Sequence, residues 1–304
     1  MKIVSGRQSL VLAKKLALSL KAELVKTDLK TLSDGDIYAR VGDGVKNVPY
    51  ARETVIVCQG GGPPTNESLV ELLLLLDAVD RQKPKKLIAL IPFYPYRRQD
   101  KINLPGEALS AQVVAKVLEV MPVDRFIFVD LHALAILDFF TKPVTHVSAL
   151  PLFSRVLAPL VSGASDEWLV VAPDEGAKER AKALAESLGV NWLVMIKKRG
   201  RAMDKISSLT FKKSVAGKNC VIFDDEIKTG GTMATAAQLL KQRGAKKIIA
   251  AATHGLFVGE AVKLLSKSPI SKFYVTDSVN INVNLPITRL SLAPLLTEVI
   301  LSAD

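Results

Sequence analysis

The chain has 304 residues, of which 49% are hydrophobic and 23% charged, a composition that excludes disordered, fibrous and disulfide-stapled proteins. Its net charge of +11 favours a polyanionic partner, which is either nucleic acid or a small phosphorylated ligand. The most apolar segment, residues 69–76, includes Glu71 and is too short to span a bilayer, so we expect no membrane partner. Cys58 and Cys220 lie in apolar runs and are expected to be buried thiols; with no secretory signal in the sequence, this predicts a cytoplasmic protein.

Predicted strands and helices alternate along the chain. Short apolar runs, each expected to be a strand, lie at residues 55–58, 87–91, 126–129, 169–172, 193–196, 220–223 and 248–252. Helical periodicity is expected at residues 67–81, 107–120, 178–188 and 233–243, and Gly244 is placed to end the last of these helices. The alternation predicts an α/β fold with parallel sheets covered by helices on both faces, because strands buried in this way are continuously apolar.

Residues 142–150 separate two similar series of strands and helices. They predict two α/β halves, an N-terminal domain of residues 1–145 and a C-terminal domain of residues 146–304. Basic clusters such as those at Lys85 and Lys246 directly precede predicted strands, so we expect them to be solvated turn residues. Because no aromatic residues are interleaved with these clusters, nucleic acid is not expected as a partner. The side chains that bind ligands should instead follow the carboxyl ends of strands.

One segment after a predicted strand carries the strongest chemical signal. It combines two adjacent acids with a glycine-containing turn: Asp224, Asp225, Thr229, Gly230, Gly231 and Thr232. The glycines allow a tight turn, and Thr232 is expected to cap the following helix, so that backbone N–H groups and the helix dipole point at one place where a phosphate fits. The two carboxylates could accept hydrogen bonds from sugar hydroxyls or hold a cation. The alternative is an ordinary strand–turn–helix with solvated acids.

This segment resembles the PRPP-binding signature of the type I phosphoribosyltransferase fold. Other motifs occur in the order found in ribose-phosphate pyrophosphokinases, also called PRPP synthetases, at residues 33–36, 94–100, 130–132, 173–176, 197–199 and 253–255. The resemblance covers essentially the whole chain and implies two phosphoribosyltransferase-like domains, each a mainly parallel sheet flanked by helices. It also implies the reaction, in which the β,γ-diphosphoryl group of ATP passes to the C1 hydroxyl of ribose 5-phosphate to give PRPP and AMP, with Mg²⁺ as cofactor.

The resemblance also implies roles for individual residues. Lys197 and Arg199 would be catalytic cations of a loop that closes over the transferring group. The residues implied for ATP are Asp34, Asp36, Arg98, Gln99 and His132. The residues implied for ribose 5-phosphate are Asp224, Asp225, Thr229, Gly230, Gly231 and Thr232. His132 and Asp174 would approach Mg²⁺, directly or through water. A homo-oligomer that shares the nucleotide site between subunits is the expected assembly.

Two departures from the family pattern keep other functions open. Lys228 stands where an aspartate is common, and Leu32 stands where an aromatic residue usually stacks on adenine. They favour the alternative of a non-catalytic regulatory paralogue that binds nucleotide and associates with an active synthetase. A second alternative is an enzyme that consumes PRPP, since the phosphate turn alone does not distinguish synthesis from use.

Overall fold

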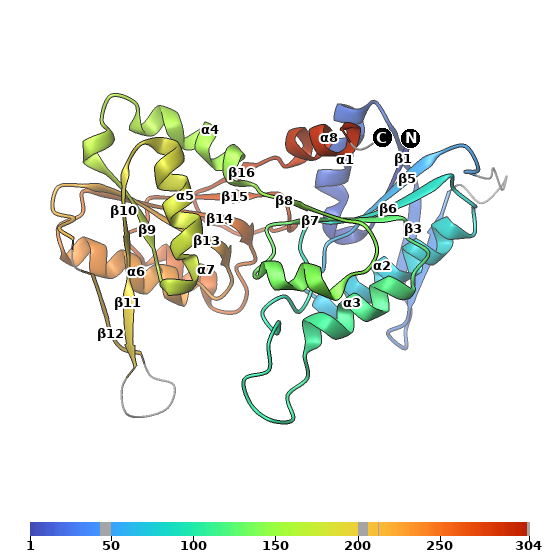
Figure 1. The fold of residues 1–304 in the computed structure, drawn as a ribbon, viewed down its shortest axis with the longest axis horizontal. Coiled ribbons are helices and arrows are strands. Elements are labelled where there is room, and N and C mark those ends of the chain that lie inside the picture. Colours follow the sequence, from blue (N-terminus) through green and yellow to red (C-terminus); the bar gives the residue numbers. More distant parts are fainter. Residues whose placement is uncertain (43–49, 200–205, 212, 303–304) are drawn as a thin grey trace. The chain divides into compact units, whose positions relative to one another are not determined.

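The computed structural model describes residues 1–42, 50–199, 206–211 and 213–302, and for residues 197–199 and 206–209 it describes the backbone alone. The chain divides into two compact units (Figure 1). Unit 1 comprises residues 1–148, 277–280 and 291–304, and unit 2 comprises residues 149–276 and 281–290. Within the described residues, no helix is long and apolar enough to cross a membrane.

Unit 1 is built on a sheet of six parallel strands. In their order across the sheet these are β2 (Glu23–Val25), β1 (Lys2–Ser5), β5 (Thr54–Cys58), β6 (Lys86–Ile91), β7 (Arg125–Val129) and β8 (Val144–Val147). The central strands are almost wholly buried apolar residues, as a sheet covered on both faces requires. The segment 142–150, which was expected to separate the two halves, contains β8, the edge strand of this sheet.

Helices cover both faces of the unit 1 sheet (Figure 1). The helices are α1 (Leu10–Leu20), α2 (Thr65–Asp80), α3 (Ser110–Val120) and α8 (Ala293–Leu301), and residues 134–139 form a short 3₁₀ helix. Helix α1 packs on α8, the last helix of the chain, which belongs to unit 1. In α2, Leu72, Leu75, Leu76 and Val79 are buried at the spacing of one helix face, which places the most apolar segment of the sequence in the core.

Unit 2 repeats this plan. In order across its six-stranded parallel sheet lie β10 (Asn191–Val194), β9 (Trp168–Ala172), β13 (Asn219–Ile227), β14 (Lys247–Gly255), β15 (Lys272–Thr276) and β16 (Ile287–Leu290). Its helices are α4 (Leu150–Val161), α5 (Lys178–Leu188), α6 (Gly231–Gln242) and α7 (Ala261–Ser266). Counted along the chain, both sheets have the strand order 2-1-3-4-5-6, so the prediction of two parallel α/β halves is confirmed.

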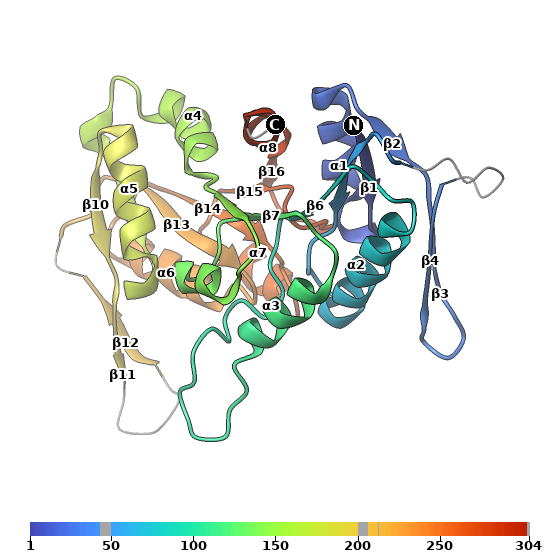
Figure 2. The same ribbon diagram turned by 45° about the vertical axis from the view of Figure 1, so that its right-hand side comes forward.

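Each unit also carries an antiparallel hairpin outside its main sheet. Strands β3 (Thr27–Thr31) and β4 (Ile37–Val41) form the hairpin of unit 1, which projects from the sheet in Figure 2. Strands β11 (Ile196–Arg199) and β12 (Ile206–Thr210) form the hairpin of unit 2. Neither strand was predicted: β3 has a single apolar residue, Leu29, whereas β4 does alternate at Ile37, Ala39 and Val41, a signal that could have indicated a strand.

Several predicted boundaries are wrong for identifiable reasons. The run 193–196 belongs to two strands, because β10 stays in the parallel sheet whereas β11 leaves to pair with β12. The helix predicted at 107–120 begins at Ser110, since the Glu107 carboxylate accepts hydrogen bonds from the N–H groups of Asn103 and Leu104 and so closes a separate turn. The helix at 178–188 is confirmed, and Gly244 has the positive φ of 86° expected after α6.

Candidate active site

The strand order places a topological switch point at the same position in each unit. In an open α/β sheet, the loops after two neighbouring strands diverge where the order reverses, and ligands bind at that switch point. In unit 2 the switch point lies between β9 and β13, and in unit 1 it lies between β1 and β5. Asp174 follows β9, while Asp224 and Asp225 lie in β13. The predicted ribose 5-phosphate residues therefore gather at the unit 2 switch point.

Strand β13 is longer than the strand predicted from the apolar run at residues 220–223. It continues through both acids to Ile227 and pairs with β14 as far as Gly255, whereas its pairing with β9 ends at Ile222. The expectation that the strand stops at Phe223 is therefore wrong, because backbone pairing with β14 extends it into polar residues. Beyond Ile222 no β9 residue pairs with the strand, and this leaves one flank for polar side chains.

Arg180 of helix α5 occupies this flank. Its Nη1 atom lies 2.9 Å from Asp224 Oδ1 and 2.7 Å from Asp225 Oδ1, so one guanidinium holds both carboxylates. Only 17% of the Asp224 side chain and 5% of the Asp225 side chain are exposed. Burial raises the pKa of Asp224 well above its ordinary value, and the neighbouring Asp225 carboxylate raises it further, while Arg180 opposes the shift. Arg180 was not predicted as a site residue, since it lies in an otherwise ordinary amphipathic helix.

The turn after β13 is formed by glycine rather than by a threonine cap. Helix α6 begins at Gly231, its N-cap is Gly230 with a φ of 77°, and Thr232 lies inside the first turn. The prediction that Thr232 caps the helix is therefore wrong, because the chain needs a left-handed residue there. A Cβ on Gly230 would lie 2.8 Å from Leu265 Cγ. The first N–H groups of α6 have no intrahelical acceptor, which makes this end of the helix suited to an anion.

Lys228, the departure from the family pattern, precedes this turn. Its side chain is exposed, and its carbonyl oxygen accepts a hydrogen bond from the N–H of Val258 at 3.0 Å. Thr229 is also exposed. The lysine substitution therefore leaves the backbone of the turn tied to the chain after β14, and the geometry of the glycine turn does not depend on an aspartate at this position.

In unit 1, the loops after β6 and β7 carry the other predicted ligand residues at neighbouring strand ends. Arg98 and Gln99 follow β6 and are exposed, and His132 follows β7 and is half-buried. The preceding Arg97 is only 2% exposed, lies 4.6 Å from the centre of the Phe93 ring and donates to the Asp130 carbonyl oxygen at 3.4 Å. Arg97 thus joins the two loops, a structural role that the motif alone did not reveal.

His146 supports the loop that holds His132. Its Nε2 atom accepts a hydrogen bond from the N–H of Leu131 at 3.2 Å, so this nitrogen carries no proton. Burial lowers the pKa of His146, an effect that the nearby Asp130 opposes, and this favours the neutral imidazole that the hydrogen bond requires. No motif surrounds His146 in the sequence; its partner Leu131 is distant in the chain and is brought near by the pairing of β7 with β8.

The remaining predicted residues lie on the two hairpins. Asp34 and Asp36 form the turn between β3 and β4, in which Asp34 Oδ1 accepts the N–H of Asp36 at 3.1 Å, and both are exposed together with Leu32. Lys197 and Arg199 lie in β11, but their side chains are outside the part that the structure describes. His132 belongs to unit 1 and Asp174 to unit 2. Within the described residues, no three potential metal-ligand side chains of His, Cys, Asp or Glu cluster together.

Comparison with known proteins places the chain in a family. Residues 1–121 match the N-terminal domain of ribose phosphate pyrophosphokinase, and residues 147–286 match the phosphoribosyl transferase domain. The ribose-phosphate pyrophosphokinase of Aquifex aeolicus is 36% identical over 98% of this chain and 94% of its own, and that of Vibrio parahaemolyticus is 34% identical over 99% and 95%. The crystal structure of phosphoribosylpyrophosphate synthetase from Mycobacterium smegmatis, 33% identical, covers 99% of this chain and 98% of its own with a TM-score of 0.88. The chain belongs to the ribose-phosphate pyrophosphokinase family.

Proposed function

We propose that this protein is a ribose-phosphate diphosphokinase, which transfers the β,γ-diphosphoryl group of ATP to the C1 hydroxyl of ribose 5-phosphate and so forms PRPP and AMP. The observation that carries this proposal is the relationship to ribose-phosphate pyrophosphokinases over almost the full length of the chain. A transfer of this kind depends on positioning and charge neutralisation more than on covalent chemistry. The protein must therefore hold two anionic substrates in line and supply cations around the transferring group.

Ribose 5-phosphate binds at the switch point of unit 2. The N–H groups at Gly231 and Thr232 hold its phosphate, with Thr229 and Gly230 completing the turn. Asp224 and Asp225 accept hydrogen bonds from the ribose hydroxyls, and this orients the C1 hydroxyl for attack. The buried pair of carboxylates, held by Arg180 at 2.9 and 2.7 Å, supports this role because its geometry is set before substrate arrives.

ATP binds through the loops that follow β6 and β7 in unit 1. Arg98 and Gln99 contact the polyphosphate, and His132 approaches it from the neighbouring loop. Asp34 and Asp36 hold the nucleoside. Lys197 and Arg199 close over the transferring group, where their charges stabilise the negative charge of the transition state and exclude water.

The donor chemistry around Asp174 fits a magnesium ion. Mg²⁺ is commonly held by one or two carboxylates together with waters and substrate phosphates, so a dense cluster of ligands is not required. Asp174 precedes Gly176, where a Cβ would lie 3.3 Å from Asp174 Oδ1, so glycine keeps space beside that oxygen. Asp174 would hold the ion directly and His132 through water, and Mg²⁺ when bound would neutralise charge on the polyphosphate.

The protein works as a homo-oligomer in which the nucleotide turn of one subunit contributes to the site of its neighbour. The projecting hairpin supports this arrangement, because contact with a neighbouring subunit would bury Leu32, an apolar side chain that is 47% exposed beside the Asp34–Asp36 turn (Figure 2). The substrates and the two buried free cysteines support a cytoplasmic location.

The deciding experiment is the release of AMP from ATP and ribose 5-phosphate by the purified protein, with and without Mg²⁺. We expect AMP and PRPP in equal amounts with Mg²⁺, and Lys197→Ala should abolish most turnover while ATP binding persists. Lys263→Ala, which removes an exposed lysine paired with Glu260, is the control and should keep full activity. Binding of ATP without any AMP release would instead favour the regulatory alternative, and consumption of PRPP with a free base would favour a transferase.

Mixing two inactive variants tests the shared site. Asp36→Ala and Lys197→Ala damage different components of the proposed site. If a site takes Asp36 from one subunit and Lys197 from another, mixed oligomers contain some intact sites, and activity should reappear after the variants are dissociated and reassembled together. A mixture that stays inactive despite mixed assembly would contradict sharing between subunits.

A further inference from the structure

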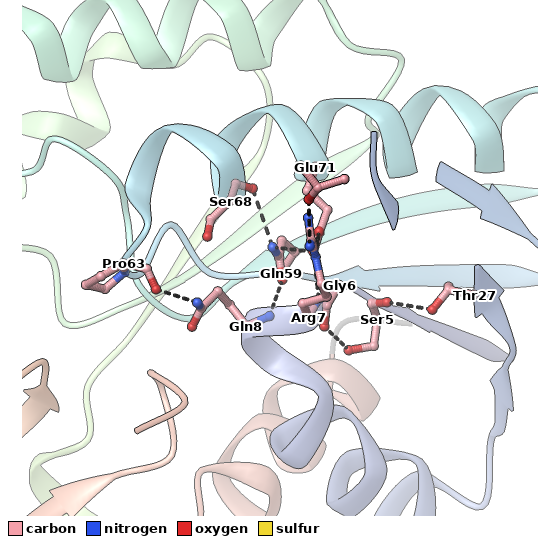
Figure 3. Close-up of polar contacts among 10 residues, drawn as sticks. Ser5, Gly6, Arg7, Gln8, Thr27, Gln59, Pro63, Ser68 and Glu71 are labelled. Atoms are coloured by element: carbon pink, nitrogen blue, oxygen red, sulfur yellow. Dashed lines mark hydrogen bonds and ion pairs between the residues drawn. The ribbon is translucent and has the colours of Figure 1, made fainter. Parts of the chain in front are cut away.

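The switch point of unit 1, between β1 and β5, is filled by the protein's own polar side chains (Figure 3). Gly6, Arg7 and Gln8 follow β1, Gln59 follows β5, and Glu71 comes from helix α2. Gln59 Oε1 accepts the N–H of Gln8 at 3.2 Å, and Gln59 Nε2 donates to Glu71 Oε1 at 2.9 Å. The position that holds the candidate substrate site in unit 2 is therefore a closed polar cluster in unit 1.

Glu71 is the centre of this cluster. Its side chain is 2% exposed, although it interrupts the most apolar run of the sequence. Glu71 Oε1 accepts the backbone N–H of Arg7 at 2.6 Å, and Glu71 Oε2 accepts Nε of the same arginine. A Cβ on Gly6 would lie 2.3 Å from Gln59 Cδ and 2.7 Å from Glu71 Oε1, so only glycine allows the chain to approach this closely. The buried carboxylate thus fixes both the backbone and the side chain of Arg7.

The guanidinium of Arg7 reaches from this cluster to the β3–β4 hairpin. Its Nη1 atom donates to Thr31 Oγ1 at 3.1 Å, and Thr31 is the last residue of β3 before the turn that carries Asp34 and Asp36. The other end of β3 is held separately, because Thr27 Oγ1 donates to the Ser5 carbonyl oxygen at 3.2 Å (Figure 3). The projecting hairpin is therefore attached near its base through Thr27 and near its tip through Arg7.

We propose that Arg7 is a positioning residue for nucleotide binding, which couples the Asp34–Asp36 turn to the buried Glu71 carboxylate. The proposal rests on the proposed function, in which this turn holds the nucleoside of ATP. Arg7 does not touch the nucleotide. It limits the orientations of the hairpin tip in the free protein, so that less conformational freedom is lost when ATP binds.

Two substitutions test this coupling from its two ends. Thr31→Val removes the acceptor for Arg7 at an exposed position, while Arg7→Gln removes the guanidinium. Thr31→Val loses one hydrogen bond from a charged donor, and Arg7→Gln loses the same bond together with the Nε contact to Glu71. Because only the bond to Thr31 restrains the hairpin tip, each variant should weaken equilibrium ATP binding and raise the KM for ATP by about 3- to 10-fold, with kcat and the KM for ribose 5-phosphate nearly unchanged. Arg40→Gln is the control, since Arg40 pairs within the hairpin with Asp28 at 3.6 Å and does not join the hairpin to the cluster.

The double variant Arg7→Gln/Thr31→Val separates positioning from general destabilisation. If Arg7 acts through Thr31, adding Thr31→Val to Arg7→Gln should weaken ATP binding no further. Multiplicative losses of ATP affinity, or unchanged ATP affinity in Thr31→Val, would overturn the proposal while the wild-type protein still binds ATP and releases AMP. Failure of the wild-type protein itself to bind ATP would instead refute the proposed function on which the coupling rests.

Discussion

Replacing Arg180 with methionine should destabilise unit 2 and weaken its substrate site together. Arg180 is 25% exposed and holds two carboxylates that are 17% and 5% exposed. At an effective dielectric constant of about 20, charges at these distances attract by roughly 6 kcal/mol per pair, and desolvation of the three groups offsets much of that attraction. Methionine keeps the apolar stem of the side chain but leaves both carboxylates without this cation.

Removal of one partner from a buried ion pair costs about 3–5 kcal/mol. We expect a value of about 3 kcal/mol for Arg180→Met, because the arginine is partly exposed and Asp224 can take up a proton. For a domain of this size, that loss should lower the melting temperature of unit 2 by about 6–12 °C in scanning calorimetry. Lys182→Met is the matched control on the same helix, since Lys182 and Glu186 form an exposed pair at 3.8 Å and their loss should cost under about 0.5 kcal/mol.

The pH dependence of the stability lost in Arg180→Met shows whether the buried carboxylates cause it. A carboxyl group whose pKa is raised on folding contributes its full stability below its ordinary pKa of 3.8 and loses that stability as pH rises through the folded-state pKa. Without Arg180 the pKa of Asp224 rises further, so the deficit relative to wild type should be smaller at pH 5 than at pH 8. The KM for ribose 5-phosphate should also rise. An unchanged melting temperature, or a deficit independent of pH, would refute the reasoning.

Three further changes test other parts of the fold and the site. Asp224→Asn should raise the free energy of unfolding at pH 7, because it removes an ionisation that burial and the neighbouring Asp225 carboxylate make unfavourable, while ribose 5-phosphate binding weakens; a less stable variant in calorimetry would contradict this. Gly230→Ala should cost about 1–3 kcal/mol in a denaturant titration, since alanine at a φ of 77° is strained and its Cβ would meet Leu265 at 2.8 Å; unaltered stability would show that the turn relaxes freely. Burial raises the pKa of Cys58 and Cys220 to about 12, so both thiols should resist a disulfide reagent at pH 8 until guanidinium unfolds the chain, and rapid labelling of the native protein would show that they are accessible.

Local pattern was enough to locate much of the fold and the phosphate turn. The buried strands of both sheets are continuous apolar runs, and α5 shows a clear helical period, so both could be read without tertiary information. Gly230 and Gly231 marked a tight turn after an apolar strand for the same reason, since the conformational freedom of glycine is a property of the residue itself. The order of short motifs along the chain also indicated the family, because each motif is contiguous in sequence.

Long-range pairing decided the features that the sequence left open. Strand β13 extends through Asp224 and Asp225 because β14 continues beside it, and no local propensity predicts that length. Arg180 reaches Asp224 from helix α5, 44 positions earlier in the chain, and Arg7 reaches Glu71 across 64 positions. Such contacts follow from which strands become neighbours and where each one ends. Burial then selects the partners of these charges, because a buried carboxylate is stable only where the fold brings a donor to it.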